Sequence, residues 1–115
     1  MKTRVLVTGG RDYRDYDKVS DTLTKLQAIH GDIVVCQGGA RGADSLAKQW
    51  CEANNVDCVT YPADWSLGKA AGPIRNAKMW NEFKPNVTVA FPGGRGTQGM
   101  MNIVKRCNGR LIVIE

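Results

Sequence analysis

Three glycine-rich segments of this chain each carry an arginine. Glycine lets a backbone approach a ligand closely because it has no Cβ, and a guanidinium can grip a phosphate through two parallel hydrogen bonds. The combination favours phosphate binding, with glycines that merely make tight turns as the alternative. The segments are Gly9-Gly10-Arg11-Asp12-Tyr13, Gly38-Gly39-Ala40-Arg41-Gly42-Ala43-Asp44 and Pro92-Gly93-Gly94-Arg95-Gly96-Thr97.

From these segments we take the glycines, the arginines and one threonine as candidate ligand-binding residues. They are Gly9, Gly10, Arg11, Gly38, Gly39, Arg41, Gly42, Gly93, Gly94, Arg95, Gly96 and Thr97. No Gly-Lys-Ser/Thr follows any of the loops, which argues against an ATP-hydrolysing P-loop. We likewise expect no Gly-x-Gly-x-x-Gly fingerprint, and therefore no dinucleotide site of the ordinary Rossmann type.

A stretch between residues 62 and 76 supplies further candidates. Trp65 follows Asp64 in an expected loop, where its ring could stack on a base or bury itself under the loop. Arg75 and Asn76 follow Pro73, which suits the first turn of a helix. Arg75 would add a fourth positive group to the site, or lie solvated on the surface. We therefore include Asp64, Trp65, Arg75 and Asn76 among the ligand-binding candidates.

Charge and composition limit the kinds of ligand and of catalytic mechanism that the chain can have. Lys and Arg number 16 against 11 Asp and Glu, a net charge of +5 that favours a nucleotide, a nucleic acid or phosphate. The single histidine, His30, argues against Ser-His-Asp and Cys-His mechanisms, and none of the four cysteines forms a Cys-x-x-Cys pair. We expect no metal site and no cofactor. No apolar run is long enough to span a membrane or to resemble a signal peptide, so we expect a cytoplasmic protein.

The elements that must position these residues alternate along the chain. Short apolar runs predict strands over 4–8, 33–37, 56–61, 86–91 and 111–114, each stopped by glycine or proline or by the end of the sequence. Between them, helical spacing joins Tyr16, Val19, Leu23, Leu26 and Ile29, then Ala43, Leu46, Ala47 and Trp50, then Ile74, Ala77 and Trp80 with Met79 as a further candidate, then Met100, Val104 and Cys107. Residues 62–72 are expected to form a loop that could act as a flap.

This alternation predicts one α/β domain over residues 1–115, a Rossmann-like fold with a five-stranded parallel sheet and helices on both faces. The carboxyl ends of parallel strands share one edge of the sheet. The three glycine-rich turns should therefore meet there, each opening a helix whose first N–H groups are free to bind an anion.

The motifs together resemble the YspA-like SLOG family, a Rossmann-like nucleotide-binding family common in bacteria and phages. The resemblance rests on the three glycine-rich segments together with Pro62-Ala63-Asp64-Trp65 and Gly72-Pro73-Ile74-Arg75-Asn76, and it covers nearly the whole chain. It implies a site for a nucleotide or a nucleotide-derived ligand, and a homodimer, since homodimers are usual among relatives.

The resemblance leaves three functions open. The first is a module that senses or sequesters a nucleotide-derived signal. The second is an enzyme like the LOG phosphoribohydrolases, whose Pro-Gly-Gly-x-Gly-Thr-x-x-Glu motif is matched over its first six positions, but Met100 stands at its glutamate. Asp64 or Asp44 would have to replace that carboxylate, although Asp44 could instead cap a helix start. The third is single-stranded DNA binding as in DprA, which needs several stacking aromatics, and besides Trp65 the chain offers Tyr13 and Tyr61. We predict the first.

Overall fold

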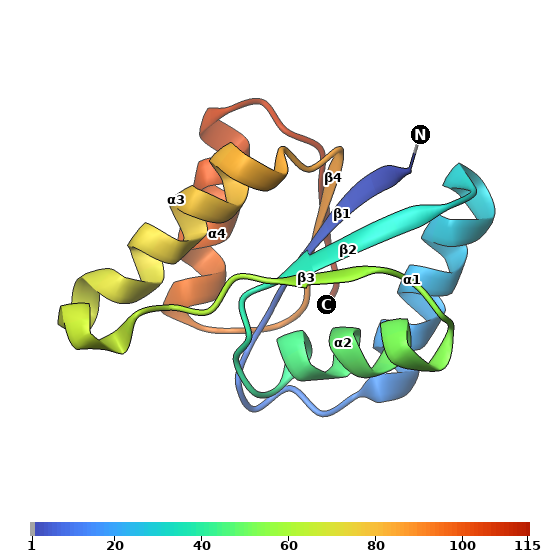
Figure 1. Cartoon of the computed structure of the whole chain (residues 1–115), viewed down its shortest axis with the longest axis horizontal. Coiled ribbons are helices and arrows are strands. Elements are labelled where there is room, and N and C mark those ends of the chain that lie inside the picture. Colours follow the sequence, from blue (N-terminus) through green and yellow to red (C-terminus); the bar gives the residue numbers. More distant parts are fainter. Residues whose placement is uncertain (1) are drawn as a thin grey trace.

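The apolar runs form one parallel sheet in the computed structural model, which describes residues 2–115 (Figure 1). The strand order is β3-β2-β1-β4-β5, with every neighbouring pair parallel. The strands are β1 (Thr3–Thr8), β2 (Ile33–Gln37), β3 (Cys58–Thr60), β4 (Val87–Ala90) and β5 (Leu111–Val113). The expected five-stranded parallel α/β sheet is confirmed.

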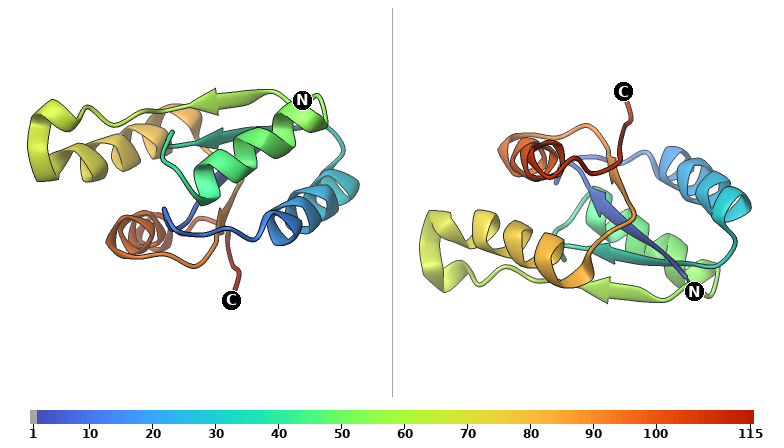
Figure 2. Two further views of the ribbon diagram at one scale, coloured as in Figure 1. Left: turned by 90° about the horizontal axis from the view of Figure 1, so that it is seen from below. Right: turned by 90° about the horizontal axis from the view of Figure 1, so that it is seen from above.

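Helices cover both faces of this sheet (Figure 2). Helices α1 (Tyr16–His30) and α2 (Ala43–Ala53) lie on one face, and α3 (Ala71–Phe83) and α4 (Arg95–Arg106) lie on the other. Successive side chains of β1 pack on opposite faces of the sheet. Val5 and Val7 are buried among α1 and α2 side chains, whereas Leu6 is buried with Met79 and Met100 from α3 and α4. This alternation follows from the period of a strand, whose successive side chains point to opposite faces.

Helix α1 begins after an aspartate cap and ends at a glycine. The Asp15 carboxylate accepts a hydrogen bond from the backbone N–H of Lys18, and Gly31 ends the helix with a φ of 76°. Its buried residues are Val19, Leu23 and Leu26, but Ile29 is 71% exposed. The buried face of α1 therefore ends one turn earlier than the sequence pattern predicts.

Helix α3 faces the core with only some of the expected residues. Ala71, Asn76, Met79 and Phe83 are buried, and of these Met79 was expected. Trp80 is half-buried and packs against the same core, as expected, and it also lines a groove described below. Ile74, at 52% exposed, and the exposed Ala77 were placed wrongly, because the buried face of the helix includes the polar Asn76 instead.

Two further expectations need correction. The predicted flap is a short 3₁₀ segment, η1 (Trp65–Ala70), that leads directly into α3. Cys107, expected on the buried face of α4, is exposed at the end of that helix.

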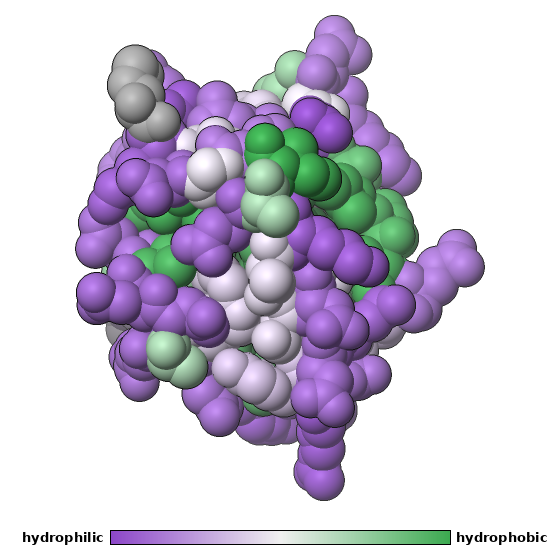
Figure 3. All heavy atoms as spheres, turned by 90° about the vertical axis from the view of Figure 1, so that its right-hand side faces the viewer, coloured by the Kyte–Doolittle hydropathy of each residue, from purple (hydrophilic) through white to green (hydrophobic). Residues whose placement is uncertain are grey.

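Hydrophilic side chains dominate the face of the molecule in Figure 3, with smaller apolar areas. Across residues 2–115, no helix is long and apolar enough to cross a membrane.

Candidate functional site

The three glycine-rich turns meet at the carboxyl edge of the sheet. The order β2-β1-β4 places the turns after these strands next to one another. The N–H of Gly10 donates to the carbonyl of Pro92 at 2.9 Å, and the carbonyl of Gly10 accepts from the N–H of Ala43 at 3.1 Å. The first turn thus bonds to the other two. It does not itself open a helix, contrary to expectation, because α1 starts only at Tyr16.

Several of the glycines are explained by this packing of turn on turn. A Cβ at Gly9 would lie 2.5 Å from the Cβ of Ala43, and one at Gly10 would lie 2.8 Å from the carbonyl oxygen of Pro92. Gly42 has a φ of +81°, and a Cβ there would overlap the carbonyl of Gly10. A Cβ at Gly93 would overlap the hydroxyl of Thr97. At these four positions the structural alternative, a tight turn, accounts for glycine.

Gly94 and Gly96 are different, because a Cβ at either position would meet no atom within 4 Å. Both lie at the start of α4, and Gly94 offers no side chain to cap its free N–H groups. Gly94-Arg95-Gly96-Thr97-Gln98-Gly99 also has the spacing Gly-x-Gly-x-x-Gly between a strand and a helix. We had expected no such fingerprint, and that was wrong: the match was visible in the sequence.

Arg75 connects α3 to the turn after β2. Its Nη1 donates to the carbonyl of Gly38 at 2.6 Å, and its Nε donates to Oδ1 of Asn76 at 2.9 Å. Asn76 is buried, and its Nδ2 donates to the carbonyl of Gly96 at 3.2 Å. The two residues therefore join the β2 turn to the start of α4, through contacts that the sequence did not predict.

Asp44 lies beneath the β2 turn. It is 7% exposed, and its Oδ2 accepts from the N–H groups of Gly38 and Ala40, both at 3.2 Å. Burial raises the pKa of this carboxyl to about 6, against the opposing effect of those hydrogen bonds and of the positive charges of Arg75 and Arg11. The carboxylate thus holds the turn in place. This role resembles the helix cap that was the alternative for Asp44, except that the N–H groups it binds precede α2 rather than belong to its first turn.

Gln37 is a site-forming residue that the sequence analysis missed. It is 1% exposed, and its Oε1 accepts from the N–H of Gly39 at 2.6 Å while its Nε2 donates to the hydroxyl of Thr60 at 2.7 Å. The signal was a polar residue at the end of an otherwise apolar strand. Gln37 and Asp44 together fix the backbone of Gly38, Gly39 and Ala40 from below.

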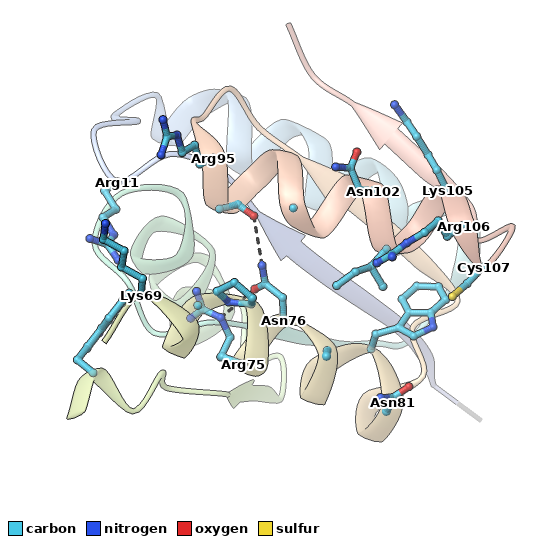
Figure 4. A pocket seen from close by; sticks show the side chains of 18 residues that line it. Arg11, Lys69, Arg75, Asn76, Asn81, Arg95, Asn102, Lys105, Arg106 and Cys107 are labelled. Atoms are coloured by element: carbon cyan, nitrogen blue, oxygen red, sulfur yellow. Dashed lines mark hydrogen bonds between the residues drawn. The ribbon is translucent and has the colours of Figure 1, made fainter. Parts of the chain in front are cut away.

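Two cavities open above this edge. The larger encloses about 990 Å³ between α3 and α4, and the smaller about 390 Å³ over the β2 turn. Arg11, Trp65 and Arg75 line both. Arg95, Gly96, Asn76 and Lys69 line the larger one (Figure 4), and Gly38, Gly39 and Arg41 the smaller.

The site has an excess of unpaired positive charge. Residues 2–115 contain two ion pairs, Lys2–Asp57 and an exposed Arg41–Asp12 contact at 3.4 Å. Within that part of the chain neither Arg75 nor Arg95 pairs with a carboxylate. Burial lowers the pKa of Arg75, and the nearby charge of Arg11 lowers it further, against the opposing pull of Asp44. A half-buried cation of this kind is stabilised by a bound anion.

Trp65 is 57% exposed, so the alternative that it buries itself under the loop is wrong. The guanidinium carbon of Arg11 lies 4.9 Å from the centre of its ring, at cation–π distance. Asp64 does not line either cavity. Its Oδ1 accepts from the N–H and the hydroxyl of Ser66 at 3.1 and 2.6 Å, which caps η1.

Other candidates also lie away from the cavities. Met100, at the position of the LOG glutamate, is fully buried against the sheet with Leu6 and Val104. Among the other aromatic candidates for stacking on DNA, Tyr13 packs on Phe91 with ring centres 5.4 Å apart, and Tyr61 packs against the α3–α4 core. Gly9, Gly10, Gly42, Gly93, Gly94 and Thr97 do not line either cavity.

Comparison with known proteins identifies the family. Residues 3–68 match the sequence profile of the YspA, cpYpsA-related SLOG family. The chain belongs to this family. The matched range includes the first two glycine-rich turns and ends before Arg75 and the third.

Two relatives extend this comparison. The Gene 61 protein of Mycobacterium phage D29 is 41% identical over 107 residues, which cover 85% of each chain. The structure of DNA processing protein A (DprA) from Streptococcus pneumoniae is similar in fold, with a TM-score of 0.56 at 15% identity. That similarity covers 96% of the SLOG chain and 58% of the DprA chain, so the SLOG chain spans little more than half of DprA.

Family membership indicates binding related to nucleotides or nucleic acids, and the likeness to DprA shows the shared fold. Within residues 2–115, no group of three or more His, Cys, Asp or Glu residues is arranged to hold a metal ion. The groups that converge on the cavities are cations, backbone N–H groups and an exposed tryptophan. This set suits a phosphate joined to an aromatic base.

Proposed function

We propose that this SLOG protein binds a nucleotide or a nucleotide-derived signal and acts as a sensor or a sequestering module. The observation that carries the proposal is Arg75, whose half-buried guanidinium forms no ion pair within residues 2–115 and lines both cavities, although the buried Asp44 carboxylate acts on it at longer range. Two of its guanidinium nitrogens donate to Gly38 and Asn76, which fixes its orientation. The third nitrogen has no hydrogen bond to residues 2–115 and would donate to the phosphate we propose.

The phosphate would lie between Arg75 and the start of α4. Gly96 lines the larger cavity there, and the uncapped N–H groups of the first turn of α4 carry partial positive charge. Arg95 and Arg11 add charge from the other two sides. Because Gly96 leaves open space where a side chain would stand, an anion in the larger cavity can come close to the backbone.

The base would stack on Trp65. Arg11 already lies over this ring, so the base would either take its place or sandwich the guanidinium between itself and the indole. Release of Arg11 from the ring would direct its charge toward the phosphate. Tryptophan fluorescence is then a direct reporter of binding.

The structure offers less for the two alternative functions. LOG-type cleavage of an N-glycosidic bond requires a carboxylate near the sugar, but Met100 is buried, Asp64 caps η1, and Asp44 lies beneath the turn. Single-stranded DNA binding in the manner of stacking platforms needs several exposed aromatics, and Tyr13 and Tyr61 are packed. The homodimer that the family resemblance implies stays a prediction. Analytical ultracentrifugation tests it by measuring the mass of the protein in solution.

Native mass spectrometry of the freshly purified protein tests the proposal first. A released nucleotide with an intact glycosidic bond supports a sensor or sponge, whereas a released ribose phosphate or free base supports an N-glycosidase. Titration calorimetry with AMP, ADP and ATP is the second test. The proposal is wrong if the folded protein binds none of them and releases no nucleotide-derived molecule.

A further inference from the structure

The groove between α3 and α4 extends well past the proposed phosphate site. Arg11, Lys69 and Arg95 lie at one end of it, and Lys105 and Arg106 lie at the other (Figure 4). Asn102 and Ile103 of α4 line the second half, opposite Trp80 and Asn81 of α3. The residues of this second half, together with Lys105 and Arg106, do not belong to the proposed phosphate and base site.

The two basic ends are too far apart for one phosphate. Arg95 is the first residue of α4 and Arg106 is the last. Eleven residue steps along a helix correspond to about 16 Å. A phosphate held by Arg75 and Arg95 therefore cannot also reach Lys105 and Arg106. A ligand that fills the groove needs a second anionic group.

The groove is also free of acidic side chains. Six of its lining residues are Lys or Arg, whereas none of the chain's 11 Asp and Glu residues lines it. Neither Lys105 nor Arg106 forms an ion pair within residues 2–115. Basic residues at the end of a helix interact favourably with the helix dipole, which could account for these two at the end of α4. That effect does not explain why the groove between them and Arg95 contains no carboxylate.

The wall between the two ends is mostly apolar. Pro73, Ala77 and Trp80 of α3 line one side, at spacings of four and three residues, and Gly99 and Ile103 of α4 line the other. Trp80 is half-buried, and its ring packs against the core on one side. A second base or sugar fits such a wall better than a second phosphate does. A volume of about 990 Å³ is at the upper end of the range for small-molecule sites, about 300–1,000 Å³.

We propose that the α3–α4 groove binds a linear ligand of at least two nucleotide units, whose distal phosphate is held by Lys105 and Arg106 and whose distal base lies against Trp80. This inference rests on the proposed function, since the proximal phosphate occupies the Arg75 site. A free dinucleotide and the end of a single strand share this chemistry. Both offer a second phosphate joined to a second base.

Calorimetry with three adenine ligands tests the proposal. The probe is the dinucleotide pApAp, which carries phosphates at both ends; ApA has the same two bases without terminal phosphates, and AMP has one phosphate. Wild-type protein should bind pApAp at least about tenfold more tightly than AMP, the effect of one added charge-assisted contact. ApA should bind more weakly than pApAp.

Substitutions locate the second phosphate. The double variant Lys105→Gln/Arg106→Gln should lower the affinity for pApAp to near that for AMP while leaving AMP binding unchanged. Lys78 and Arg110 are exposed and line neither cavity, so Lys78→Gln/Arg110→Gln is a control with the same change in net charge. Asn102→Glu, an exposed position that brings a carboxylate into the groove, should weaken pApAp binding and spare AMP.

The outcomes separate this inference from the function on which it rests. If AMP binds but pApAp binds no better, or if the Lys105/Arg106 variant binds pApAp as wild type does, the distal subsite does not exist and the proposed function stands. If neither AMP nor pApAp binds, the two-unit ligand is wrong, and the ADP and ATP titrations together with native mass spectrometry decide the proposed function. A 12-nucleotide strand that binds more tightly than pApAp identifies nucleic acid as the source of the ligand; equal affinity identifies a free dinucleotide.

Discussion

The guanidinium of Arg75 donates a 2.6 Å hydrogen bond to the backbone carbonyl of Gly38, and this contact joins α3 to the turn after β2. The Nε of the same side chain donates to Oδ1 of Asn76, and Nδ2 of Asn76 donates to the carbonyl of Gly96 at the start of α4. A Cβ at Gly38 would overlap the guanidinium, so glycine at this position makes room for Arg75. The arginine is therefore held by its surroundings before any ligand binds, which reduces the entropy that binding must overcome.

Arg75→Ala should weaken nucleotide binding at least about tenfold, because it removes a charge-assisted contact from a partly desolvated site. Titration calorimetry with the nucleotide that binds wild type most tightly measures the change. Arg110→Ala, which removes an exposed arginine outside both cavities, is the control and should leave affinity unchanged. Equal affinity of folded Arg75→Ala and wild type would exclude Arg75 from the site.

Asn76→Ala should affect both folding and binding. Asn76 is 5% exposed, and its loss removes one hydrogen bond to Gly96 and one from Arg75. We expect a loss of about 1–2 kcal/mol in the free energy of unfolding, together with weaker nucleotide binding because Arg75 is no longer oriented. Urea denaturation and calorimetry measure the two effects. A variant that loses stability but keeps full affinity would show that Asn76 only supports the fold.

The sequence predicted the sheet well because its signals are local. Each strand is a short apolar run, and Asp15 and Gly31 mark the ends of α1. The face of α3 was harder to predict. Ile74, Ala77 and Trp80 have the spacing of a core face, but spacing alone does not say whether an apolar stripe faces the sheet or a groove.

The site was predicted less completely for a similar reason. Parallel topology brings the three turns together, so that part followed from the strand pattern. The bonds from Arg75 to Gly38 and from Gln37 to Gly39 depend on side-chain directions that emerge only after the helices have packed. Lys105 and Arg106 lie a full helix away from the turns in the sequence, and only the packing of α4 against α3 brings them to the same groove.

A pair of glycine substitutions separates the structural role of glycine from a role in binding. Gly42→Ala should destabilise the protein strongly, since Gly42 has a φ of +81° and a Cβ would collide with the carbonyl of Gly10. Gly96→Ala should leave the melting temperature near that of wild type, because its Cβ meets open space in the middle of the first turn of α4. It should nevertheless weaken nucleotide binding, since the methyl group occupies the space of the ligand. Unchanged affinity would assign Gly96 no role in the site.

Met100→Glu tests whether the protein is a LOG-type hydrolase that lacks only its carboxylate. Met100 is fully buried among Leu6, Met79 and Val104, away from the groove. A glutamate there would place an unpaired charge in the core, and we expect a loss of about 3–5 kcal/mol in the free energy of unfolding. We expect no release of adenine from AMP by wild type or variant, measured by liquid chromatography. Hydrolysis by a folded Met100→Glu protein would contradict the placement of this side chain in the core.

Asp44 should make the stability of the protein depend on pH. The direction of that dependence shows whether burial or the surrounding donors and cations govern the pKa of its carboxyl. Burial raises its pKa to about 6 in the folded protein, against 3.8 for an ordinary aspartate. Between these values the folded state binds more protons than the unfolded state, so stability should rise as the pH falls from about 7 to 4. The carboxyl can still accept from Gly38 and Ala40 when protonated.

Asp44→Asn isolates this contribution, because an amide keeps the acceptor oxygen but does not titrate. Measured by urea denaturation, wild type should gain on the order of 2 kcal/mol relative to the variant between pH 7.5 and pH 4.5. The opposite slope would mean that the hydrogen bonds from Ala40 and Gly38, together with the nearby charges of Arg75 and Arg11, outweigh the burial of the carboxylate. The sign of this one difference therefore shows whether burial or these surrounding donors and cations govern the carboxyl beneath the turn.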